Sequence, residues 1–325
     1  KLNRKVKIFI PKGLAKTISV LEENDIKKIF PYEDVKKFKQ RALTPTSPTQ
    51  KGTAQNPDVF FQNRERCNTL YNDVYNKAIE TFELIESICG RSYSPYEYYG
   101  DKNAEYIVVV IGSAYQTIQE TVDYLNNNGK KVGVINVRLY RPFFANEFSK
   151  VIPNTVKKIA VLDRTKENGV GEPLYIDVCS ALKETNISAE TFGGRYGLGG
   201  KEFNTGHALS VFENIFSTNP KNHFTVGIND DITNTSLPET MLDLDDDCYE
   251  LKFYGLGSDG TVSANKNSIK IIGENTDKFV QGYFQYDSKK SGGVTRSHIR
   301  ISDKTIRSPY YVDIPSLIVV SKEEY

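Results

Sequence analysis

The chain has 325 residues, of which 38% are hydrophobic and 26% are charged, a composition typical of globular proteins and not of disordered or membrane-embedded ones. One hydrophobic core rarely serves so long a chain, so two or more domains are expected. With 42 basic and 41 acidic residues the formal net charge is +1, so no overall field would attract nucleic acid or an anionic surface.

The first hundred residues predict helices around an extended connector. Residues 1–42 are rich in lysine and favour helix, whereas the prolines within residues 43–48 break any periodicity. Within residues 63–88, apolar side chains recur at steps of three and four, which predicts an amphipathic helix that ends at Gly90. A domain boundary is expected near residue 100.

The middle of the chain alternates between apolar runs and helical patterns. The expected strands are residues 106–111, 131–137 and 158–162, and the expected helices are residues 116–127, 145–150 and 174–182. A short, entirely apolar run such as residues 106–111 suits a parallel strand that is covered on both faces. The pattern predicts an α/β fold with a doubly wound, mostly parallel sheet and right-handed crossovers.

A second linker is expected after this domain. Residues 229–234 are dense in Asn, Asp and Thr, and an acidic run follows at residues 243–247. A strand at residues 250–254 then begins a third unit. The expected domains are therefore residues 1–100, 101–242 and 243–325.

The third unit opens with a glycine-rich loop. Residues 255–260 read Gly-Leu-Gly-Ser-Asp-Gly, between a predicted strand and a predicted helix at residues 261–272. Glycines let the backbone approach an anion, and the free amides of the following helix favour negative charge. We expect Gly257, Ser258, Asp259 and Gly260 to contact a phosphorylated ligand. A tight strand-to-helix turn without a ligand is the alternative.

Two lysines follow the next predicted strand, residues 280–286. Lys289, Lys290 and Ser291 lie in a polar loop that we expect at the same edge of a parallel sheet as the glycine loop. Cations at this place suit a ligand with a ribose phosphate better than an unphosphorylated ribose. Coenzyme A carries both a diphosphate and a 3′-phosphate, so it matches this pattern. NADP is the competing ligand, and a solvated loop is the alternative without a ligand.

The cysteines and histidines form no metal or redox pattern. They are Cys67, Cys89, Cys179, Cys248, His207, His223 and His298. None of them lies at the close spacing typical of zinc, Cys-x-x-Cys or iron–sulfur sites. Free thiols in a reducing compartment, either the cytoplasm or a reducing organelle, are the simplest expectation. No apolar run approaches the roughly 20 residues that span a bilayer, so we expect neither an export signal nor a membrane anchor.

Several long motifs make the chain resemble one enzyme family, the pyruvate:ferredoxin (flavodoxin) oxidoreductases. The resemblance covers roughly residues 30–325. The motifs are residues 52–58 (GTAQNPD) with 60–62 (FFQ), 138–143 (RLYRPF), 162–167 (LDRTKE) with 171–175 (GEPLY), 193–198 (GGRYGL), 252–254 (KFY), 265–273 (NKNSIKIIG) and 286–297.

The resemblance implies a place for each domain in a longer enzyme. Residues 1–100 resemble the end of a thiamine pyrimidine-binding domain, residues 101–242 a transketolase C-terminal-like domain, and residues 243–325 the start of a coenzyme A-binding domain. Such enzymes oxidatively decarboxylate pyruvate to acetyl-coenzyme A and CO2, using thiamine diphosphate, Mg²⁺ and 4Fe-4S clusters. Electrons pass to ferredoxin or flavodoxin.

The chain lacks the parts of that family that hold the thiamine diphosphate, its Mg²⁺ and the clusters. We therefore expect an inactive internal fragment with no catalytic residue and no metal ligand of its own. Its partners would be the remaining domains of the parent enzyme, which is commonly a homodimer, with neither nucleic acid nor membrane among them. A fusion that passes electrons to NADP and a non-catalytic scaffold relative are the alternatives.

Some of the motifs also have structural interpretations. Arg141 and Arg195 are expected at contacts between domains or subunits, because Arg suits interface carboxylates and carbonyls. Residues 163–167 are interpreted as an ion-paired loop and not as an acid/base pair. Residues 52–58, with the aromatic pair Phe60 and Phe61 that follows them, are interpreted as a fixed interdomain loop.

Overall fold

The computed structural model describes residues 21–48, 54–230, 232–242, 244, 248–287 and 292–323, and the backbone of residues 6–8 and 16–18. The chain divides into two compact units. The first comprises Lys1–Lys5, Ser19–Pro95 and Arg138–Phe144, and the second comprises Val6–Ile18, Tyr96–Val137 and Ala145–Tyr325.

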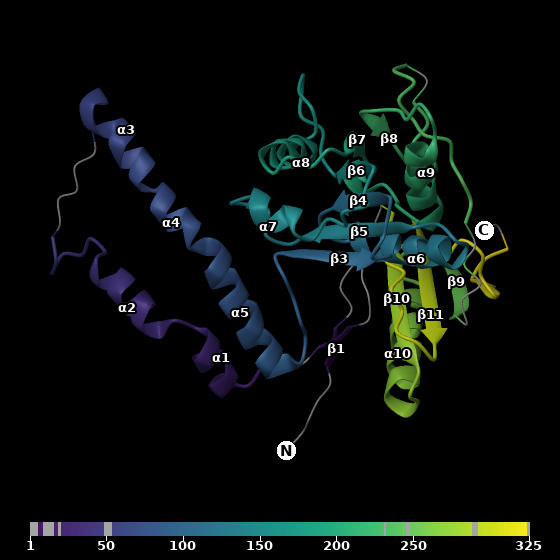
Figure 1. The fold of residues 1–325 in the computed structure, drawn as a ribbon. Coiled ribbons are helices and arrows are strands. Elements are labelled where there is room, and N and C mark those ends of the chain that lie inside the picture. Colours follow the sequence, from purple (N-terminus) through teal and green to yellow (C-terminus); the bar gives the residue numbers. More distant parts are fainter. Residues whose placement is uncertain are drawn as a thin grey trace. The chain divides into compact units, whose positions relative to one another are not determined.

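The described part of the first unit is helical. Its helices are α1 (Glu23–Ile29), α2 (Tyr32–Gln40), α3 (Pro57–Arg66), α4 (Asn68–Asn72) and α5 (Val74–Cys89) (Figure 1). The predicted amphipathic helix is confirmed as α5 with α4 before it. It ends at Gly90, whose φ of +68° is readily adopted only by a residue without a side chain.

Residues 54–61 correct one sequence interpretation. Phe60 and Phe61 lie in helix α3, which starts at Pro57, and not in an interdomain loop. Proline at the first helical position is favoured because its missing N–H would have no intrahelical partner anyway. Gly52 and Thr53 of the same motif lie outside the described residues.

The second unit contains a six-stranded sheet in the order β3-β5-β4-β6-β7-β8. The strands are β3 (Tyr96–Gly100), β4 (Tyr106–Val110), β5 (Val132–Val137), β6 (Lys158–Asp163), β7 (Glu190–Arg195) and β8 (Phe224–Thr225). Only the edge strand β3 is antiparallel to its neighbour. The predicted mostly parallel α/β sheet is confirmed.

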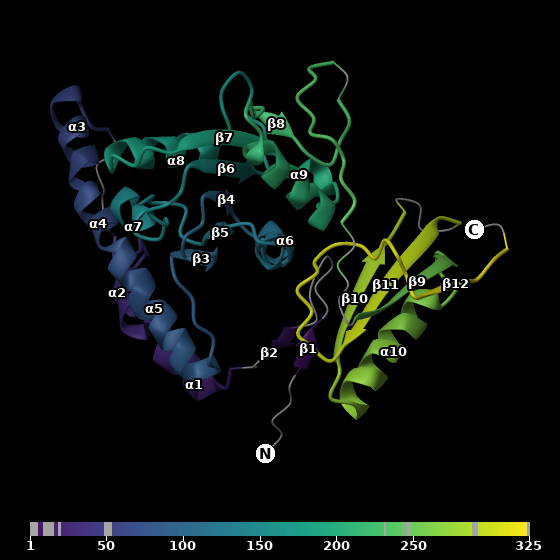
Figure 2. The same ribbon diagram turned by 45° about the vertical axis from the view of Figure 1, so that its right-hand side comes forward.

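Helices cover both faces of this sheet. Helices α6 (Ala114–Asn127) and α9 (Thr205–Phe216) contact each other on one face, and α7 (Ala145–Ser149) and α8 (Pro173–Glu184) contact each other on the other (Figure 2). The apolar strands β4 and β5 are buried almost completely between these layers. This burial explains why the two strands read as continuous apolar runs in the sequence.

A four-stranded sheet in the order β10-β11-β9-β12 forms the C-terminal part of the second unit. Its strands are β9 (Cys248–Leu256), β10 (Phe279–Gln285), β11 (Val294–Ser302) and β12 (Leu317–Val320). Helix α10 (Thr261–Asn275) covers one face, where Ile269 packs against Val280 and Ile299. The side chains that alternate with these on β10 and β11 are polar and form the other face.

Some elements escaped the sequence analysis. Strand β7 is rich in glycine, and strand β3 begins at Tyr96, directly after the turn residues at positions 93–95. Helix α9 buries polar residues such as Thr205, His207 and Ser210 together with apolar ones, so its sequence shows no clear division into an apolar and a polar face. Strands β1 (Val6–Ile8) and β2 (Lys16–Ile18) form a separate antiparallel pair.

The expected second linker is in part fixed to the six-stranded sheet. The amide of Leu237 donates to the carbonyl of Thr225 at 2.8 Å, and the Leu237 side chain is buried in the core of this domain. Residues 243 and 245–247 of the acidic run lie outside the described residues. Within the described ranges, no helix combines the length and the apolar character needed to cross a membrane.

Candidate functional site

The glycine loop joins β9 to α10, as predicted. The Asp259 carboxylate folds back and accepts the amide of Leu256 at 2.7 Å and that of Thr261 at 2.8 Å. A Cβ on Gly255 would lie 2.7 Å from the Asp259 carboxylate and 2.6 Å from the Thr261 hydroxyl. The first glycine of the motif is therefore required by the closure of the loop itself.

The carboxylate of Asp259 is held in its ionised form. Burial raises its pKa, but hydrogen bonds from Thr261, from the Leu256 amide and from Ser321 outweigh that effect, so the pKa lies below its ordinary value. Asp259 is thus the anionic cap of the loop. The amides of Val262 and Ser263, in the first turn of α10, have no acceptor within the helix.

The end of β10 lies at the same edge of the sheet as the glycine loop. In the strand register Gln285 is paired with Arg296, which is paired with Tyr254. The end of β10 therefore lies at the edge where the lysine loop is expected. The sheet is mixed and not parallel throughout, since β11 lies between β9 and β10 and runs antiparallel to both, whereas β12 is parallel to β9. The connection from β10 to β11 is too short for a parallel crossover. Lys289, Lys290 and Ser291 lie outside the described residues.

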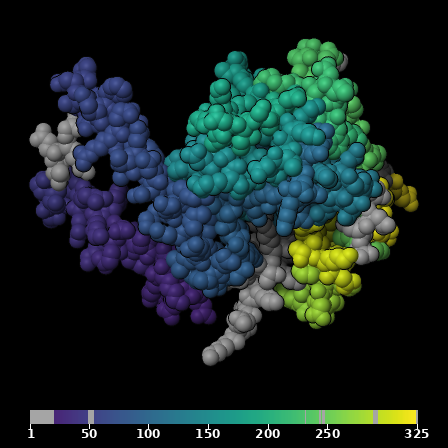
Figure 3. Space-filling view, viewed as in Figure 1, coloured from purple at the N-terminus to yellow at the C-terminus, as the bar shows by residue number. Residues whose placement is uncertain are grey.

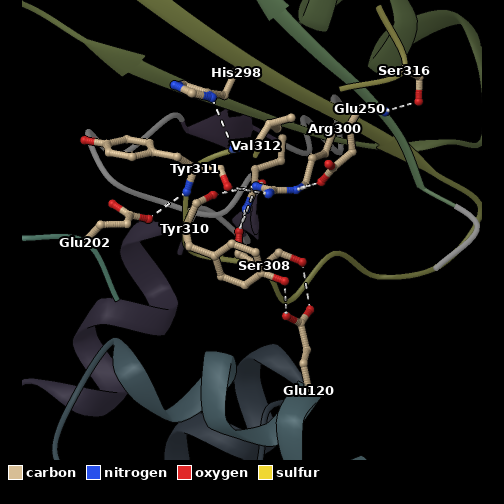
Figure 4. A network of polar contacts seen from close by, with 11 residues as sticks. Glu120, Glu202, Glu250, His298, Arg300, Ser308, Tyr310, Tyr311, Val312 and Ser316 are labelled. Carbon is tan, nitrogen blue, oxygen red and sulfur yellow. Dashed lines mark hydrogen bonds and ion pairs between the residues drawn. The ribbon is translucent and has the colours of Figure 1, made fainter. Parts of the chain in front are cut away.

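The polar face of the four-stranded sheet is covered by residues 307–313, which we call the strap. Arg300 of β11, only 2% exposed, forms an ion pair with Glu250 of β9. Its other nitrogens donate to the Gln281 side chain and to the backbone carbonyls of Ser308, Tyr310 and Tyr311 (Figure 4). Each guanidinium nitrogen therefore has an acceptor within the chain.

His298 fixes the strap from the same strand. Its Nδ1 accepts the amide of Val312 at 3.1 Å, and its ring stacks on that of Tyr311 with 4.8 Å between the centroids. Burial, followed by the nearby charges of Lys252 and Arg300, lowers the pKa of His298 to about 3. His298 is therefore a neutral structural side chain.

The strap also contacts the six-stranded domain. Glu120 of α6 accepts the hydroxyl groups of Ser308 at 2.7 Å and Tyr310 at 2.8 Å, and Glu202 accepts the Tyr311 amide at 2.7 Å (Figure 4). Burial raises the pKa of Glu120, and the two hydroxyl donors offset this only in part. In Figure 3 the yellow C-terminal residues lie directly below the blue and teal residues of the six-stranded domain.

A second group of polar side chains lies at the carboxyl edge of the parallel sheet. Glu172, which precedes α8, is 2% exposed, and it forms an ion pair with Arg195 at the end of β7. Its second oxygen lies 2.7 Å from Nδ1 of His223. Arg195 also donates to the carbonyl of His223 at 3.0 Å. We call these three residues the edge cluster.

The edge cluster gives Arg195 a partner within its own domain, because its guanidinium binds Glu172. A contact of Arg195 with another domain or subunit stays a prediction. The side chain of Arg141 lies beside that of its neighbour Tyr140, with its Nη2 donating to the Tyr140 hydroxyl at 3.1 Å. An interface role for Arg141 stays a prediction.

The predicted ion-paired loop at residues 163–167 is wrong for its first two residues. Asp163 accepts the amide of Leu174 at 2.9 Å and that of Tyr175 at 3.2 Å, and so caps α8. Arg164 donates to the carbonyl of Gly197 at 2.9 Å. Burial raises the pKa of Asp163 to about 6 despite the two amide donors.

Sequence reasoning missed Glu172, His223 and Arg300 as members of polar networks. For Glu172 the sequence held one sign, a glycine in the middle of a strand at position 193, which indicates close approach of another group. A Cβ on Gly193 would lie 2.6 Å from the Glu172 carboxylate. For His223 and Arg300 the sequence held no such sign. Within the described part of the chain, no group of three His, Cys, Asp or Glu side chains could hold a metal ion.

Comparison with known proteins gives a consistent result in both parts of the second unit. Residues 104–208 match the family described as pyruvate:ferredoxin oxidoreductase core domain II. Residues 250–325 match the family described as pyruvate ferredoxin/flavodoxin oxidoreductase.

Three curated relatives illustrate the similarity. The chain is 50% identical to the pyruvate:ferredoxin oxidoreductase of Moorella thermoacetica over 312 residues, covering 95% of this chain and 27% of the relative. It is 48% identical to the pyruvate-flavodoxin oxidoreductase of Enterobacter agglomerans, with the same coverage. It is also 48% identical to the pyruvate dehydrogenase [NADP(+)] of Cryptosporidium parvum, covering 95% of this chain and 16% of the relative. The chain thus spans about a quarter, or less, of the length of these proteins.

Proposed function

We propose that this chain, which belongs to the pyruvate:ferredoxin/flavodoxin oxidoreductase family, is part of a longer enzyme. That enzyme would convert pyruvate and coenzyme A to acetyl-coenzyme A and CO2. The match of residues 250–325 to that family carries the proposal. Thiamine diphosphate with Mg²⁺ would supply the decarboxylation chemistry and 4Fe-4S clusters the electron transfer, both held by other parts of the parent chain. Ferredoxin or flavodoxin would accept the electrons.

The contribution of this chain would be part of the coenzyme A site. The amides of the first turn of α10 suit a diphosphate, because they have no acceptor within the helix and lie at the positive end of its dipole. Ser258 and Gly260, with φ of +74° and +88°, turn the backbone at this helix end. Lys289, Lys290 and Ser291 follow β10, which ends at the same sheet edge, and would bind the 3′-phosphate.

Asp259 would have a different role from the one expected of a ligand contact. Its carboxylate is engaged by the amides of Leu256 and Thr261, so it would hold the loop in shape and not bind phosphate. An anion at this position also repels a second anion, which would keep the diphosphate on the side of the helix amides and the lysines.

The remaining contribution would be scaffolding. The domains at residues 1–100, 101–242 and 243–325 would correspond to the end of a thiamine pyrimidine-binding domain, a transketolase C-terminal-like domain and the start of a coenzyme A domain. Through its contacts with Glu120 and Glu202, the strap would fix the sheet that carries the glycine loop to the six-stranded domain. The assembled enzyme would be a homodimer in a reducing compartment.

The lysine pair gives the sharpest test. In the full-length enzyme, replacing Lys289 and Lys290 by alanine should weaken coenzyme A binding by about 1–3 kcal/mol, the range for charge-assisted hydrogen bonds. Isothermal titration calorimetry with coenzyme A and with dephospho-coenzyme A measures the effect. The loss should shrink for dephospho-coenzyme A, because that ligand lacks the 3′-phosphate.

A matched control removes the same charge elsewhere in this domain. Lys270 lies past the middle of α10, and Lys278 precedes the start of β10, where it pairs with Asp303. The double variant Lys270→Ala/Lys278→Ala should bind coenzyme A normally. Equal affinity of the wild type and the Lys289/Lys290 variant would refute the assignment of the lysines.

NADP is a second electron acceptor to consider, because the Cryptosporidium relative is named for it and is as similar as the Enterobacter one. Pyruvate oxidation by the full-length enzyme, measured with ferredoxin, flavodoxin and NADP in turn, distinguishes a ferredoxin- or flavodoxin-linked enzyme from an NADP-linked one. Reduction of NADP alone would assign the parent to the NADP-linked type.

A further inference from the structure

The edge cluster has the features of a built site. His223 has a φ of +53°, a left-handed conformation that non-glycine residues rarely adopt and that often accompanies function. The Asn222 side chain accepts the His223 amide at 2.9 Å and the Gly193 amide at 2.8 Å, and it donates to the Tyr175 hydroxyl at 3.3 Å. The backbone of His223 is therefore held firmly in place.

Two family motifs serve this arrangement. Gly193 leaves room for the Glu172 carboxylate, and a Cβ on Gly194 would lie 2.2 Å from the ring of Phe224, the residue after His223. The motifs 171–175 and 193–198 thus meet at one place. The coenzyme A proposal uses neither of them.

The protonation of the cluster follows from its contacts. Burial would raise the pKa of Glu172, but its hydrogen bonds, chiefly those from the backbone and from His223 and Arg195, hold the pKa below its ordinary value. An ionised carboxylate accepts a hydrogen bond, so Nδ1 of His223 carries the hydrogen. The other ring nitrogen, Nε2, then donates a hydrogen bond only when the imidazole is protonated.

The cluster opens to a surface hollow of about 350 Å³. Its lining residues are Lys166, Glu167, Gly169, Val170, Gly171, Glu172, Arg195 and His223. The His223 side chain is 46% exposed, whereas Glu172 is 2% exposed, so the imidazole and not the carboxylate faces a ligand. The loop has open space above Gly169, where an added Cβ would meet no atom within 4 Å.

The charges around the hollow select the kind of ligand. Arg195 is paired with Glu172, and the lining residues Lys166 and Glu167 carry opposite charges. Outside the lining, Asp230 interacts with Arg195 and Asp163 with Glu172. Tyr175, whose ring meets that of His223 edge-on, is uncharged at neutral pH, because burial raises its pKa. Protonation of His223 therefore adds a positive charge directly at the hollow, with the Lys166 ammonium as a second donor.

We propose that this hollow is a binding site for a small oxyanion, a phosphate or carboxylate group, which binds with uptake of a proton by His223. The anion accepts from Nε2 of the imidazolium and from Lys166, while Glu172 stabilises the imidazolium through Nδ1. The proton comes from solvent, and no covalent bond changes. The site is separate from the glycine loop and does not depend on the coenzyme A proposal.

Calorimetric titration of the full-length enzyme at pH 6 and pH 8 tests the site, with inorganic phosphate and acetate as probes. Binding should be at least tenfold tighter at pH 6. The heat at pH 6 should differ between buffers of different ionisation enthalpy, because a proton is taken up. Tighter binding of phosphate identifies a phosphoryl site, and tighter binding of acetate a carboxylate site.

Variants separate this site from others on the enzyme. His223→Gln should weaken binding at least tenfold and abolish proton uptake, and Lys166→Gln, an exposed position, should weaken it several-fold without affecting folding. Lys183→Gln, at the far end of α8, is the matched control and should bind normally, as should the Lys289/Lys290 variant. Absence of binding at pH 6, or equal binding by wild type and both site variants, would overturn the proposal.

Discussion

The six-stranded and the four-stranded sheets each contain a glutamate paired with an arginine, with one buried partner in each pair, but the two pairs have different surroundings. Arg300 is 2% exposed, and all of its nitrogens donate to groups of its own chain. The side chain of Arg195 is 15% exposed, and its partner Glu172 also binds a histidine that opens to a hollow.

The difference indicates two uses of the same ion pair. A saturated pair such as Arg300–Glu250 fixes the backbone of the strap, and it has no donor left for a ligand. The Arg195–Glu172 pair instead sets the orientation and hydrogen position of His223, whose second nitrogen stays available. Saturation of the hydrogen-bonding groups, and not burial alone, distinguishes a structural pair from a candidate binding site.

The largest effect is expected at the saturated pair. Arg300→Ala removes the ion pair with Glu250 and leaves three strap carbonyls without their guanidinium donor, so the free energy of unfolding should fall by about 3–5 kcal/mol. Urea unfolding followed by circular dichroism measures this loss. Lys278→Ala, which breaks an exposed pair with Asp303, is the control and should change little. A loss below about 1 kcal/mol would show that the strap does not depend on Arg300.

Asp163, close to the edge cluster, should make the free energy of unfolding depend on pH. Its pKa of about 6 in the folded chain lies above the unfolded value, so its stabilising contribution is complete below about pH 4 and is lost as pH rises through 6. The loss is about 3 kcal/mol. Unfolding at pH 4, 5, 6 and 7 should show a steeper decline for the wild type than for Asp163→Asn. Parallel curves would refute the raised pKa.

The open pair should be more tolerant than the saturated one. Arg195→Ala should cost about 2 kcal/mol at pH 8, because Glu172 keeps His223 as a hydrogen-bonding partner. Urea unfolding of both variants under the same conditions measures the two costs. The comparison of the two pairs fails if Arg195→Ala destabilises as much as Arg300→Ala.

The smallest effect is expected at the outer end of the strap. Arg307 pairs with Asp123 and donates to the Tyr99 hydroxyl at 3.2 Å, but its side chain is 33% exposed. Arg307→Gln should therefore cost only about 0.5–1 kcal/mol in urea unfolding. The effect should fall further in high salt, since water and ions screen an exposed pair. A cost near that of Arg300→Ala would place the main anchor of the strap at Arg307.

The elements with strong local patterns were predictable. Strands β4 and β5 follow from their apolar runs, helix α6 from its helical pattern, and the glycine loop from its place between a strand and a helix. Strand β7 was not predictable, because Gly193 and Gly194 disfavour a strand, and neither was helix α9, because it buries polar residues such as His207 and Ser210. In both cases packing against distant residues decides the structure.

The α/β class, the family resemblance and the glycine loop could be inferred from the sequence, because they depend on residues that are close together in the chain. The folded structure was needed to show that Asp259 closes its own loop, that Arg195 pairs with Glu172, and that β11 runs antiparallel to the two strands beside it. Each depends on a contact between side chains or strands whose partner the local pattern does not specify. Glu172 meets His223 across 51 positions of sequence, and Glu120 meets Ser308 across 188, separations that only folding brings together.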